Sequence, residues 1–320
     1  MNTIRVGCIG SGVIGSSWAV TFARAGLSVA VYDVSLSART AAESSIGRML
    51  TVLSREGEIR SLNEVRSRIR FVASVEEAAS EATLVQESVR EDLETKRILF
   101  AELDRVAPSN AILASSTSEI PSSQFTERLH GRARCLVAHP LNPPHLVPLV
   151  EICPSPWTDI SVVSATRRFF DSVGQQPIVV QREIPGFIAN RMQVAVIIEG
   201  VRLVAEGYCT PEDLDRAMSQ GLGMRWTLMG PLATNRFAAP RGYEQFLNEY
   251  WHTLQSIAAT LQPDYVPPPG TGHRIEEALK QASGADTSEI MDWRDVALIR
   301  LARLLKELDS QREKAKGPSQ

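Results

Sequence analysis

The feature that most constrains the fold is a glycine-rich turn near the start of the chain. Residues 10–15 read Gly-Ser-Gly-Val-Ile-Gly, directly after an apolar run at residues 4–9 and at the start of a helical pattern over residues 13–25. A second apolar run, residues 27–32, then leads to Asp33, which lies 18 residues after the last glycine. A G-x-G-x-x-G turn in this strand–helix–strand context predicts a dinucleotide site.

Each part of the turn has a mechanical role in that interpretation. Gly10 permits the tight turn, Gly12 lets a pyrophosphate approach the backbone, and Gly15 lets the helix pack closely on the strand. The first helical residues, Val13 and Ile14, present free N–H groups at the positive end of the helix dipole, where phosphate binds well.

The acidic residue Asp33 selects among dinucleotides. Its carboxylate would accept hydrogen bonds from a ribose 2′-hydroxyl and repel a 2′-phosphate, which favours NAD over NADP. FAD is the other dinucleotide candidate, and a glycine-rich turn in an ordinary α/β domain is the non-functional alternative.

The rest of the chain falls into two parts. Short β-rich runs alternate with helical patterns over about 180 residues, which predicts a mostly parallel sheet covered on both faces. After Glu183 the pattern changes to helices, and residues 187–206 are apolar on nearly all sides. We therefore predict an α/β fold: an N-terminal Rossmann-type doubly wound sheet over residues 1–183, followed by an all-helical substrate and dimerisation domain over residues 184–320.

Composition excludes several classes of function. With 43% apolar and 22% charged residues, the 320-residue chain is not disordered, and a net charge of −3 gives no basic excess for nucleic acid or an anionic membrane. No run of about 18 apolar residues is present. The N-terminus lacks a secretory-signal pattern, and the four cysteines form no C-x-x-C pair. We expect a cytoplasmic protein with reduced thiols, no metal site, and a small molecule as its partner.

A histidine and a carboxylate form a candidate acid–base pair. His139 directly follows a predicted strand over residues 135–138, and residues at the carboxyl ends of strands line the ligand crevice of open α/β sheets. Glu151 lies within the apolar stretch 147–152, where an unpaired charge would be costly. His139 would supply its partner, while Glu151 would fix the tautomer and stabilise the imidazolium. The alternative for a lone histidine is a satisfied core or surface group.

Six stretches, in this order, carry a resemblance to a known family: residues 10–15, 86–96, 115–118, 139–144, 148–151 and 185–191. They resemble the L-3-hydroxyacyl-CoA dehydrogenase superfamily, and most closely its branch of lambda-crystallin and L-gulonate 3-dehydrogenase. The resemblance runs from Val6 to about Leu232 and implies NAD-dependent oxidation of a 3-hydroxyl group.

The resemblance also implies roles for the catalytic residues. His139 matches the base that removes the hydroxyl proton, and Glu151 matches the residue that orients it. Ser118 and Asn190 match residues that hold the substrate oxygen and the catalytic centre. The structural alternatives are a helix cap for Ser118 and a packing contact for Asn190.

Further positions match cofactor contacts of the family. Asn142 matches a residue near the histidine on the nicotinamide side, and Glu91 and Lys96 match positions near the nicotinamide ribose. We also predict that Ser116 contacts the cofactor. Lys96 also lies on a charged helix face, where solvation is the usual outcome.

One stretch bears on the substrate. Residues 221–226 read Gly-Leu-Gly-Met-Arg-Trp and resemble the gulonate and carnitine dehydrogenase branches. Arg225 offers a bidentate fork that suits a free carboxylate, and the alternative is an exposed arginine beside a packed Trp226. We rank L-gulonate or a similar short L-3-hydroxy acid first, ahead of carnitine and short 3-hydroxyacyl-CoA. A non-catalytic, crystallin-like NAD-binding protein is the alternative from another class. The apolar helix predicts a homodimer through the C-terminal domain.

Overall fold

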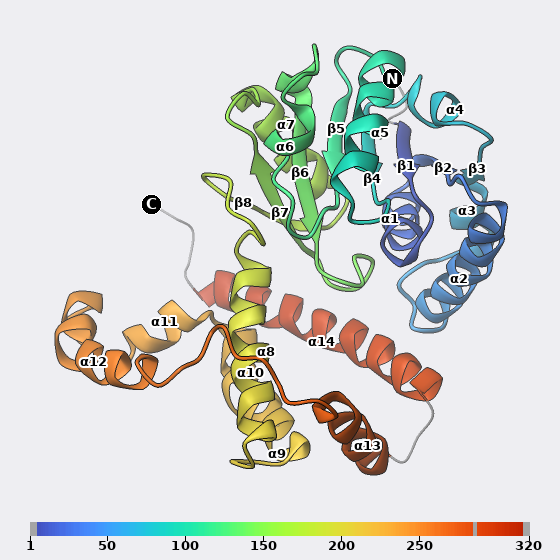
Figure 1. Cartoon of the computed structure of the whole chain (residues 1–320). Helices are drawn as coiled ribbons and strands as arrows, with labels where there is room; N and C mark the ends of the chain where they lie inside the picture. Colours follow the sequence, from blue (N-terminus) through green and yellow to red (C-terminus); the bar gives the residue numbers. More distant parts are fainter. Residues whose placement is uncertain (1–4, 284–286, 316–320) are drawn as a thin grey trace. The chain divides into compact units, whose positions relative to one another are not determined.

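The computed structural model describes residues 5–283 and 287–315. The chain divides into two compact units (Figure 1). The first comprises Met1–Asn190 together with Asp295–Ala302, and the second comprises Arg191–Arg294 and Arg303–Gln320. A short segment near the end of the chain thus belongs to the first unit, a feature that the pattern of strands and helices along the sequence does not indicate.

The first unit is built on a sheet of eight strands in the order β3-β2-β1-β4-β5-β6-β7-β8. The strands are β1 (Arg5–Ile9), β2 (Ser28–Tyr32), β3 (Ile69–Phe71), β4 (Leu84–Glu87), β5 (Ile112–Ser115), β6 (Cys135–Pro140), β7 (Leu149–Pro154) and β8 (Gln176–Val179). Every neighbouring pair is parallel except β6 and β7, which are antiparallel. The predicted mostly parallel, doubly wound sheet is confirmed.

Helices cover both faces of this sheet (Figure 1). One face packs on α1 (Val13–Arg24), α2 (Leu36–Arg55), α3 (Leu62–Ser67) and α7 (Ile160–Ser172). The other packs on α4 (Val75–Ala79), α5 (Leu93–Val106) and α6 (Ser123–Thr126). A 3₁₀ turn over Arg132–Arg134 precedes β6. Because both faces are buried, a ligand of this sheet is expected at the loops that follow the carboxyl ends of the strands.

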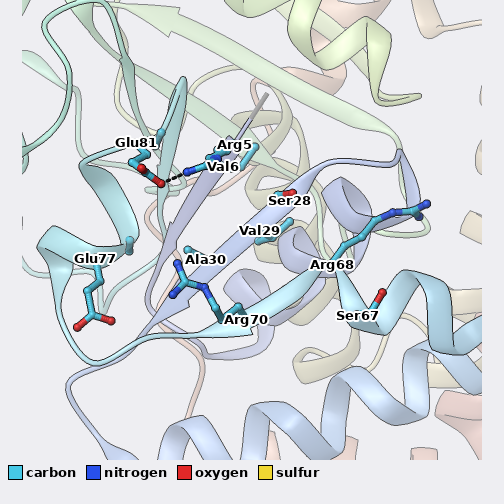
Figure 2. Close-up of a pocket in the computed structure, with 12 residues that line it drawn as sticks. Arg5, Val6, Ser28, Val29, Ala30, Ser67, Arg68, Arg70, Glu77 and Glu81 are labelled. Atoms are coloured by element: carbon cyan, nitrogen blue, oxygen red, sulfur yellow. Dashed lines mark ion pairs between the residues drawn. The ribbon is translucent and has the colours of Figure 1, made fainter. Parts of the chain in front are cut away.

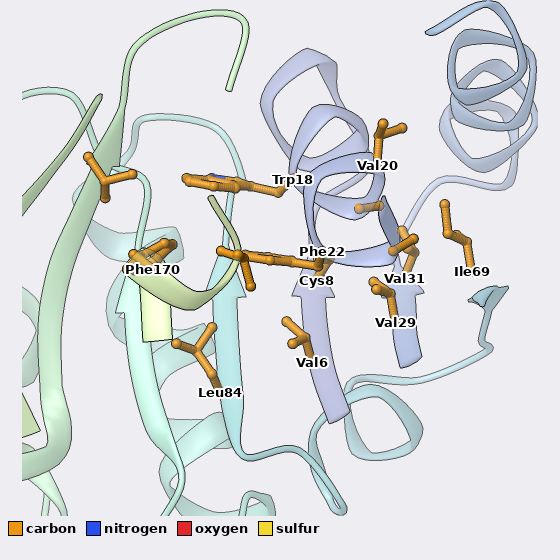
Figure 3. Close-up of a cluster of buried hydrophobic side chains, with 14 of the residues drawn as sticks. Val6, Cys8, Trp18, Val20, Phe22, Val29, Val31, Ile69, Leu84 and Phe170 are labelled. Carbon is orange, nitrogen blue, oxygen red and sulfur yellow. The ribbon is translucent and has the colours of Figure 1, made fainter. Parts of the chain in front are cut away.

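Aromatic residues anchor the helix that follows the glycine turn (Figure 3). Trp18 stacks on Phe22 with ring centroids 5.1 Å apart and meets Phe170 of α7 at 5.4 Å. All three side chains are fully buried. The indole Nε1 also donates to Ser116 Oγ at 3.1 Å, so α1 is fixed both to α7 and to the loop after β5.

The second unit is helical, as predicted. It contains most of α8 (Ala189–Ala205), then α9 (Pro211–Arg216), a π-helical segment (Ala217–Leu222), α10 (Gly223–Leu228), α11 (Pro231–Arg236), α12 (Tyr243–Ala258), α13 (Thr271–Ser283) and parts of α14 (Thr287–Ala315). Thr210 caps α9 by accepting from Asp213 N, with Pro211 at the first helical position. Within the described ranges, no helix combines the length and apolar character that a membrane span requires.

Two local features differ from the sequence-based expectation. His139 lies within β6 rather than after it, because this strand continues to Pro140 to pair with β7. The long helix predicted from residue 187 begins at Ala189, because Gly186 and Phe187 take left-handed backbone angles, with φ of 74° and 49°. The turn that these two residues form lies next to the acid–base pair.

Candidate active site

The glycine turn has the geometry that a dinucleotide requires. Gly10 has φ of 92°, and a Cβ there would lie 2.5 Å from the carbonyl oxygen of Ser88. At Gly15 a Cβ would lie 1.9 Å from the carbonyl oxygen of Gly10, so helix and strand approach too closely for any other residue. At Gly12, by contrast, no atom lies within 4 Å of a Cβ position. The space is therefore open at the one glycine over which a pyrophosphate would pass.

The start of α1 supplies the hydrogen-bond donors for such a group. Among the described residues, no side chain caps this helix. The N–H groups of Val13 and Ile14 are among those that have no partner within the helix. Val13 is also 66% exposed, while Ile14 packs partly against the core. Uncapped N–H groups beside an open glycine fit the phosphates of NAD.

The carboxylate of Asp33 is fixed beside this turn. Its Oδ2 accepts from the backbone N and the hydroxyl of Ser11, at 2.7 and 3.1 Å, and its Oδ1 accepts from Ser35 N at 2.9 Å. The side chain is half-buried at the end of β2. These three hydrogen bonds fix the orientation of the Asp33 carboxylate.

His139 and Glu151 form a buried hydrogen-bonded pair. The imidazole Nδ1 lies 2.8 Å from Glu151 Oε2, and the two residues are 4% and 0% exposed. They are register partners across the antiparallel strands β6 and β7. The geometry therefore brings together the two residues that the sequence analysis paired, with Nε2 as the second ring nitrogen.

The other oxygen of Glu151 is held by the beginning of α8. Oε1 accepts from the backbone N of Ile188 at 2.8 Å and of Ala189 at 3.0 Å. Burial by itself raises the pKa of this carboxyl group, but the hydrogen bonds from His139, Ala189 and Ile188 outweigh it and hold the pKa below its ordinary value. Glu151 is therefore an ionised partner for the imidazole.

Phe187 covers the imidazole from one side. Its ring centroid lies 5.5 Å from that of His139, and its side chain is fully buried with Val137, Cys153 and Val180. The turn that places Phe187 also directs the N–H groups of residues 188 and 189 at Glu151. Sequence reasoning missed this contact, although Phe187 belongs to the Pro-Gly-Phe stretch that carries the family resemblance.

The hydroxyl of Ser116 lies among three polar side chains, one from α1 and two from the end of β4 and the residue that follows it. Its hydroxyl accepts from Trp18 Nε1 and from Gln86 Nε2, at 3.1 and 2.7 Å, and lies 2.9 Å from Ser88 Oγ. Because the Ser116 oxygen already accepts from two donors, its own hydroxyl proton is directed to Ser88 Oγ. Ser116, directly after β5, is thus linked to α1 and to the end of β4.

Glu91 and Lys96 lie together, and the lysine is buried rather than solvated, while Glu91 is exposed. Lys96 is 1% exposed, and its Nζ lies 3.3 Å from Glu91 Oε2. The same ammonium contacts both oxygens of Glu87, at 2.9 and 3.0 Å. Glu87 is fully buried and was not identified from the sequence. The available signal was a carboxylate at the end of an apolar strand, where a charge needs a partner.

Ser118 and Asn190 are in contact. Asn190 Nδ2 donates to the carbonyl oxygen of Ser118 at 2.8 Å. Ser118 is exposed, and Asn142 is exposed next to the cis peptide bond that it forms with Pro143. Arg225, the remaining predicted site residue, is an exposed residue of α10 in the second unit, with Trp226 partly buried beside it.

A cavity of about 310 Å³ lies elsewhere in the first unit, by the amino-terminal parts of β1, β2 and β3 (Figure 2). Arg5, Arg70, Glu77 and Glu81 line it, and Arg5 pairs with Glu81. Ligands of open α/β sheets bind at the carboxyl ends of the strands, so this cavity is separate from the candidate active site.

Two protein-family models match the chain. The model of the 3-hydroxyacyl-CoA dehydrogenase NAD binding domain matches residues 5–184, and that of the 3-hydroxyacyl-CoA dehydrogenase C-terminal domain matches residues 186–266. The chain belongs to the 3-hydroxyacyl-CoA dehydrogenase family and is an NAD-dependent dehydrogenase of this type. The family resemblance and the cofactor inferred from the sequence are confirmed.

Individual relatives cover most of the chain. A lambda-crystallin homolog of Homo sapiens is 37% identical over 97% of this chain and 100% of its own length. An L-carnitine dehydrogenase of Streptomyces griseus is 34% identical over 92% of this chain and 84% of its own. A solved 5-formyl-3-hydroxy-2-methylpyridine 4-carboxylic acid 5-dehydrogenase, an NAD⁺-dependent dismutase, has a TM-score of 0.79 at 28% identity, covering 96% of this chain and 99% of that one.

Proposed function

We propose that this protein oxidises the 3-hydroxyl group of a small L-3-hydroxy acid, similar to L-gulonate, to the 3-keto acid. The observation that carries the proposal is the buried His139–Glu151 pair near the carboxyl edge of a sheet whose glycine turn fits NAD. NAD, when bound, accepts the hydride.

The residues of the chain move and hold the proton. Glu151 occupies Nδ1 of His139, which leaves Nε2 to take the proton of the substrate hydroxyl. The imidazolium that results is stabilised by the ionised carboxylate behind it. Ser118 and Asn190 are our candidates for holding the substrate oxygen, and donors there also stabilise an oxyanion in the reverse, ketone-reducing direction.

The remaining assigned roles concern the cofactor. We infer that Gly10, Gly12, Val13, Ile14 and Gly15 bind the pyrophosphate, since a free space and free N–H groups meet there. Asp33 would accept the hydroxyls of the adenine ribose. Glu91 and Lys96 would lie at the nicotinamide ribose, with Asn142 near the reacting end, and we count Ser116 among the cofactor-binding residues.

We assign Arg225 to the substrate carboxylate. Its side chain is exposed, so its guanidinium is free to form a bidentate, charge-assisted contact with a free acid. The Arg225→Met variant tests this: kcat/KM for a small 3-hydroxy acid should fall by more than about tenfold, and a change below about twofold would reject the clamp.

Two other substrates have support among the relatives. One relative is an L-carnitine dehydrogenase, and the family is named for 3-hydroxyacyl-CoA. The non-catalytic alternative is a crystallin-like protein, since another relative is a lambda-crystallin homolog. NADH formation with gulonate, 3-hydroxybutyrate, carnitine and 3-hydroxybutyryl-CoA separates these functions. Tight NADH binding without turnover of any of the four would favour the structural role.

We further propose a cytoplasmic homodimer with an NAD-binding domain over residues 1–183 and a substrate and dimerisation domain over residues 184–320. In the second unit, Met192 of α8 is 62% exposed, and Trp251 of α12 is 50% exposed. Among its described large apolar residues, Phe246 is the one that is buried. So much exposed apolar surface is typical of an interface between subunits. Sedimentation at monomer mass would contradict the dimer.

A further inference from the structure

We propose that Glu91 is a positioning residue for Ser118 and that the buried Glu87–Lys96 pair holds Glu91 in place. This inference rests on the proposed function, in which the Ser118 hydroxyl holds the substrate oxygen. It gives Glu91 a task beyond a contact to the cofactor ribose, and it assigns a role to Glu87.

One carboxylate oxygen of Glu91 accepts hydrogen bonds from three consecutive residues. Oε1 accepts from the hydroxyl of Thr117, from Ser118 N at 3.0 Å and from Glu119 N at 3.2 Å. Thr117 Oγ1 in turn accepts from Ile120 N at 3.0 Å. Hydrogen bonds to an ionised acceptor are about twice as strong as neutral ones. The backbone directly after β5 is therefore organised around this carboxylate.

Both backbone polar groups of Ser118, its N–H and its carbonyl oxygen, form hydrogen bonds to side chains. Its N–H donates to Glu91, and its carbonyl oxygen accepts from Asn190 Nδ2 at 2.8 Å. Within the described part of the chain, the Ser118 hydroxyl has no hydrogen-bond partner. A fixed backbone with an unengaged hydroxyl is the arrangement that a substrate-holding serine needs.

The other oxygen of Glu91 faces the buried lysine. Lys96 Nζ lies 3.3 Å from Glu91 Oε2 and bridges to both oxygens of Glu87. Glu87 is itself fixed by Val89 N, at 2.7 Å, and by the hydroxyl of Ser115. The ammonium between two carboxylates keeps Glu91 oriented, so that Oε1 points at residues 117–119.

The hydrogen bonds hold the pKa of Glu91 below its ordinary value. Burial raises the pKa of this carboxyl group, but the Thr117 hydroxyl and the positive charge of Lys96 lower it by more. Glu91 therefore stays ionised, and an ionised group is the stronger acceptor for the three donors.

The first test is amide hydrogen exchange, because it does not depend on activity. Glu91 suits the test better than the fully buried Glu87, since its side chain is 33% exposed and its loss leaves the Glu87–Lys96 pair intact. In Glu91→Ala, exchange at Ser118 and Glu119 should rise at least about tenfold. Glu91→Gln, which keeps an acceptor oxygen, should recover part of the protection. The control is Glu94→Ala, which removes an exposed glutamate of α5 that pairs with Arg97, and it should leave exchange at 117–119 unchanged.

The second test is a double-mutant cycle on kcat at saturating NAD. Glu91→Ala should lower kcat about tenfold in the wild-type background and less than about twofold in the Ser118→Ala background, because both changes remove the same function. Additive losses, or an effect confined to the KM for NAD, would overturn the proposal. Unchanged exchange at Ser118 would overturn it as well.

The two tests separate this inference from the proposed function. If the wild-type protein turns over no substrate of the panel, the proposed function fails. Hydrogen exchange at Ser118 then decides by itself whether Glu91 positions this residue.

Discussion

His139 and Glu151 are directly opposed residues of the antiparallel strands β6 and β7, with Nδ1 and Oε2 2.8 Å apart. Opposed residues of an antiparallel pair project from the same face, so the backbone register itself brings the imidazole to the carboxylate. A slip of one residue would move Glu151 to the other face of the sheet. Among the strand pairs that the structure describes, the antiparallel pair β6–β7 is thus the one that assembles the acid–base pair.

Glu151→Gln tests the carboxylate. The amide keeps the size of the side chain but cannot stabilise an imidazolium by charge, so kcat/KM should fall by about 100-fold or more. The KM for NAD should stay within about twofold, since Glu151 makes no part of the glycine turn. Steady-state kinetics measure both, with the exposed Glu94→Gln as the matched control. Equal activity of the two variants would contradict the role of Glu151.

The glycines of the turn should respond differently to the same substitution. Gly12→Ala adds a Cβ into open space at an ordinary φ of −64°, so the melting temperature should change little while NADH binding weakens strongly. Gly15→Ala forces a Cβ against the carbonyl of Gly10, so the melting temperature should fall by several degrees. Thermal melts and NADH fluorescence titrations check this pair. Normal NADH affinity in Gly12→Ala would place the pyrophosphate elsewhere.

Asp33 should set the preference between the two nicotinamide cofactors. In Asp33→Asn the negative charge that repels a 2′-phosphate is lost, while a side chain of the same size remains beside Ser11. The ratio of kcat/KM for NAD over NADP should fall by at least about tenfold. Kinetics with each cofactor in turn measure it, and an unchanged ratio would show that Asp33 does not face the ribose.

Stability should depend on pH through Glu151 and Glu91. The pKa of each is lowered in the folded protein by hydrogen bonds that outweigh burial. A depressed pKa contributes stability that is present above the unfolded value of about 4.3 and is lost as the pH falls through the folded value. Urea unfolding of the wild type and of Glu151→Gln, from neutral to acidic pH, should give free energies of unfolding that converge as the pH falls. A constant difference would contradict this linkage.

Local patterns in the sequence predict much of the sheet and of the cofactor site. The turn at residues 10–15, the acid at the end of β2 and the alternation of strands and helices are local signals with fixed physical causes. They place the second strand, for example, at residues 27–32, where the structure has β2, Ser28–Tyr32. The parallel pairing of β1 with β2 and β4 follows because a helix connects successive strands, which lets the chain return to the same edge of the sheet.

Long-range pairings are what the sequence alone does not specify. Nothing local predicts that β7 pairs antiparallel to β6, or that Glu87 and Lys96 close a buried ion pair across nine residues. The positive φ of Phe187 could not be predicted either, because phenylalanine rarely takes a left-handed backbone conformation. In the sequence, its apolar side chain indicates the start of a helix. These contacts are set by tertiary packing rather than by local propensity.

His139 is the residue on which the proposed reaction depends most directly. The measurement that tests it is NADH formation by the wild type and by His139→Gln, at saturating NAD, with whichever acid of the panel the wild type uses best. We predict that the variant binds NADH normally and loses a factor of about 100 to 10,000 in kcat/KM. Turnover by His139→Gln within about threefold of the wild type would contradict the account.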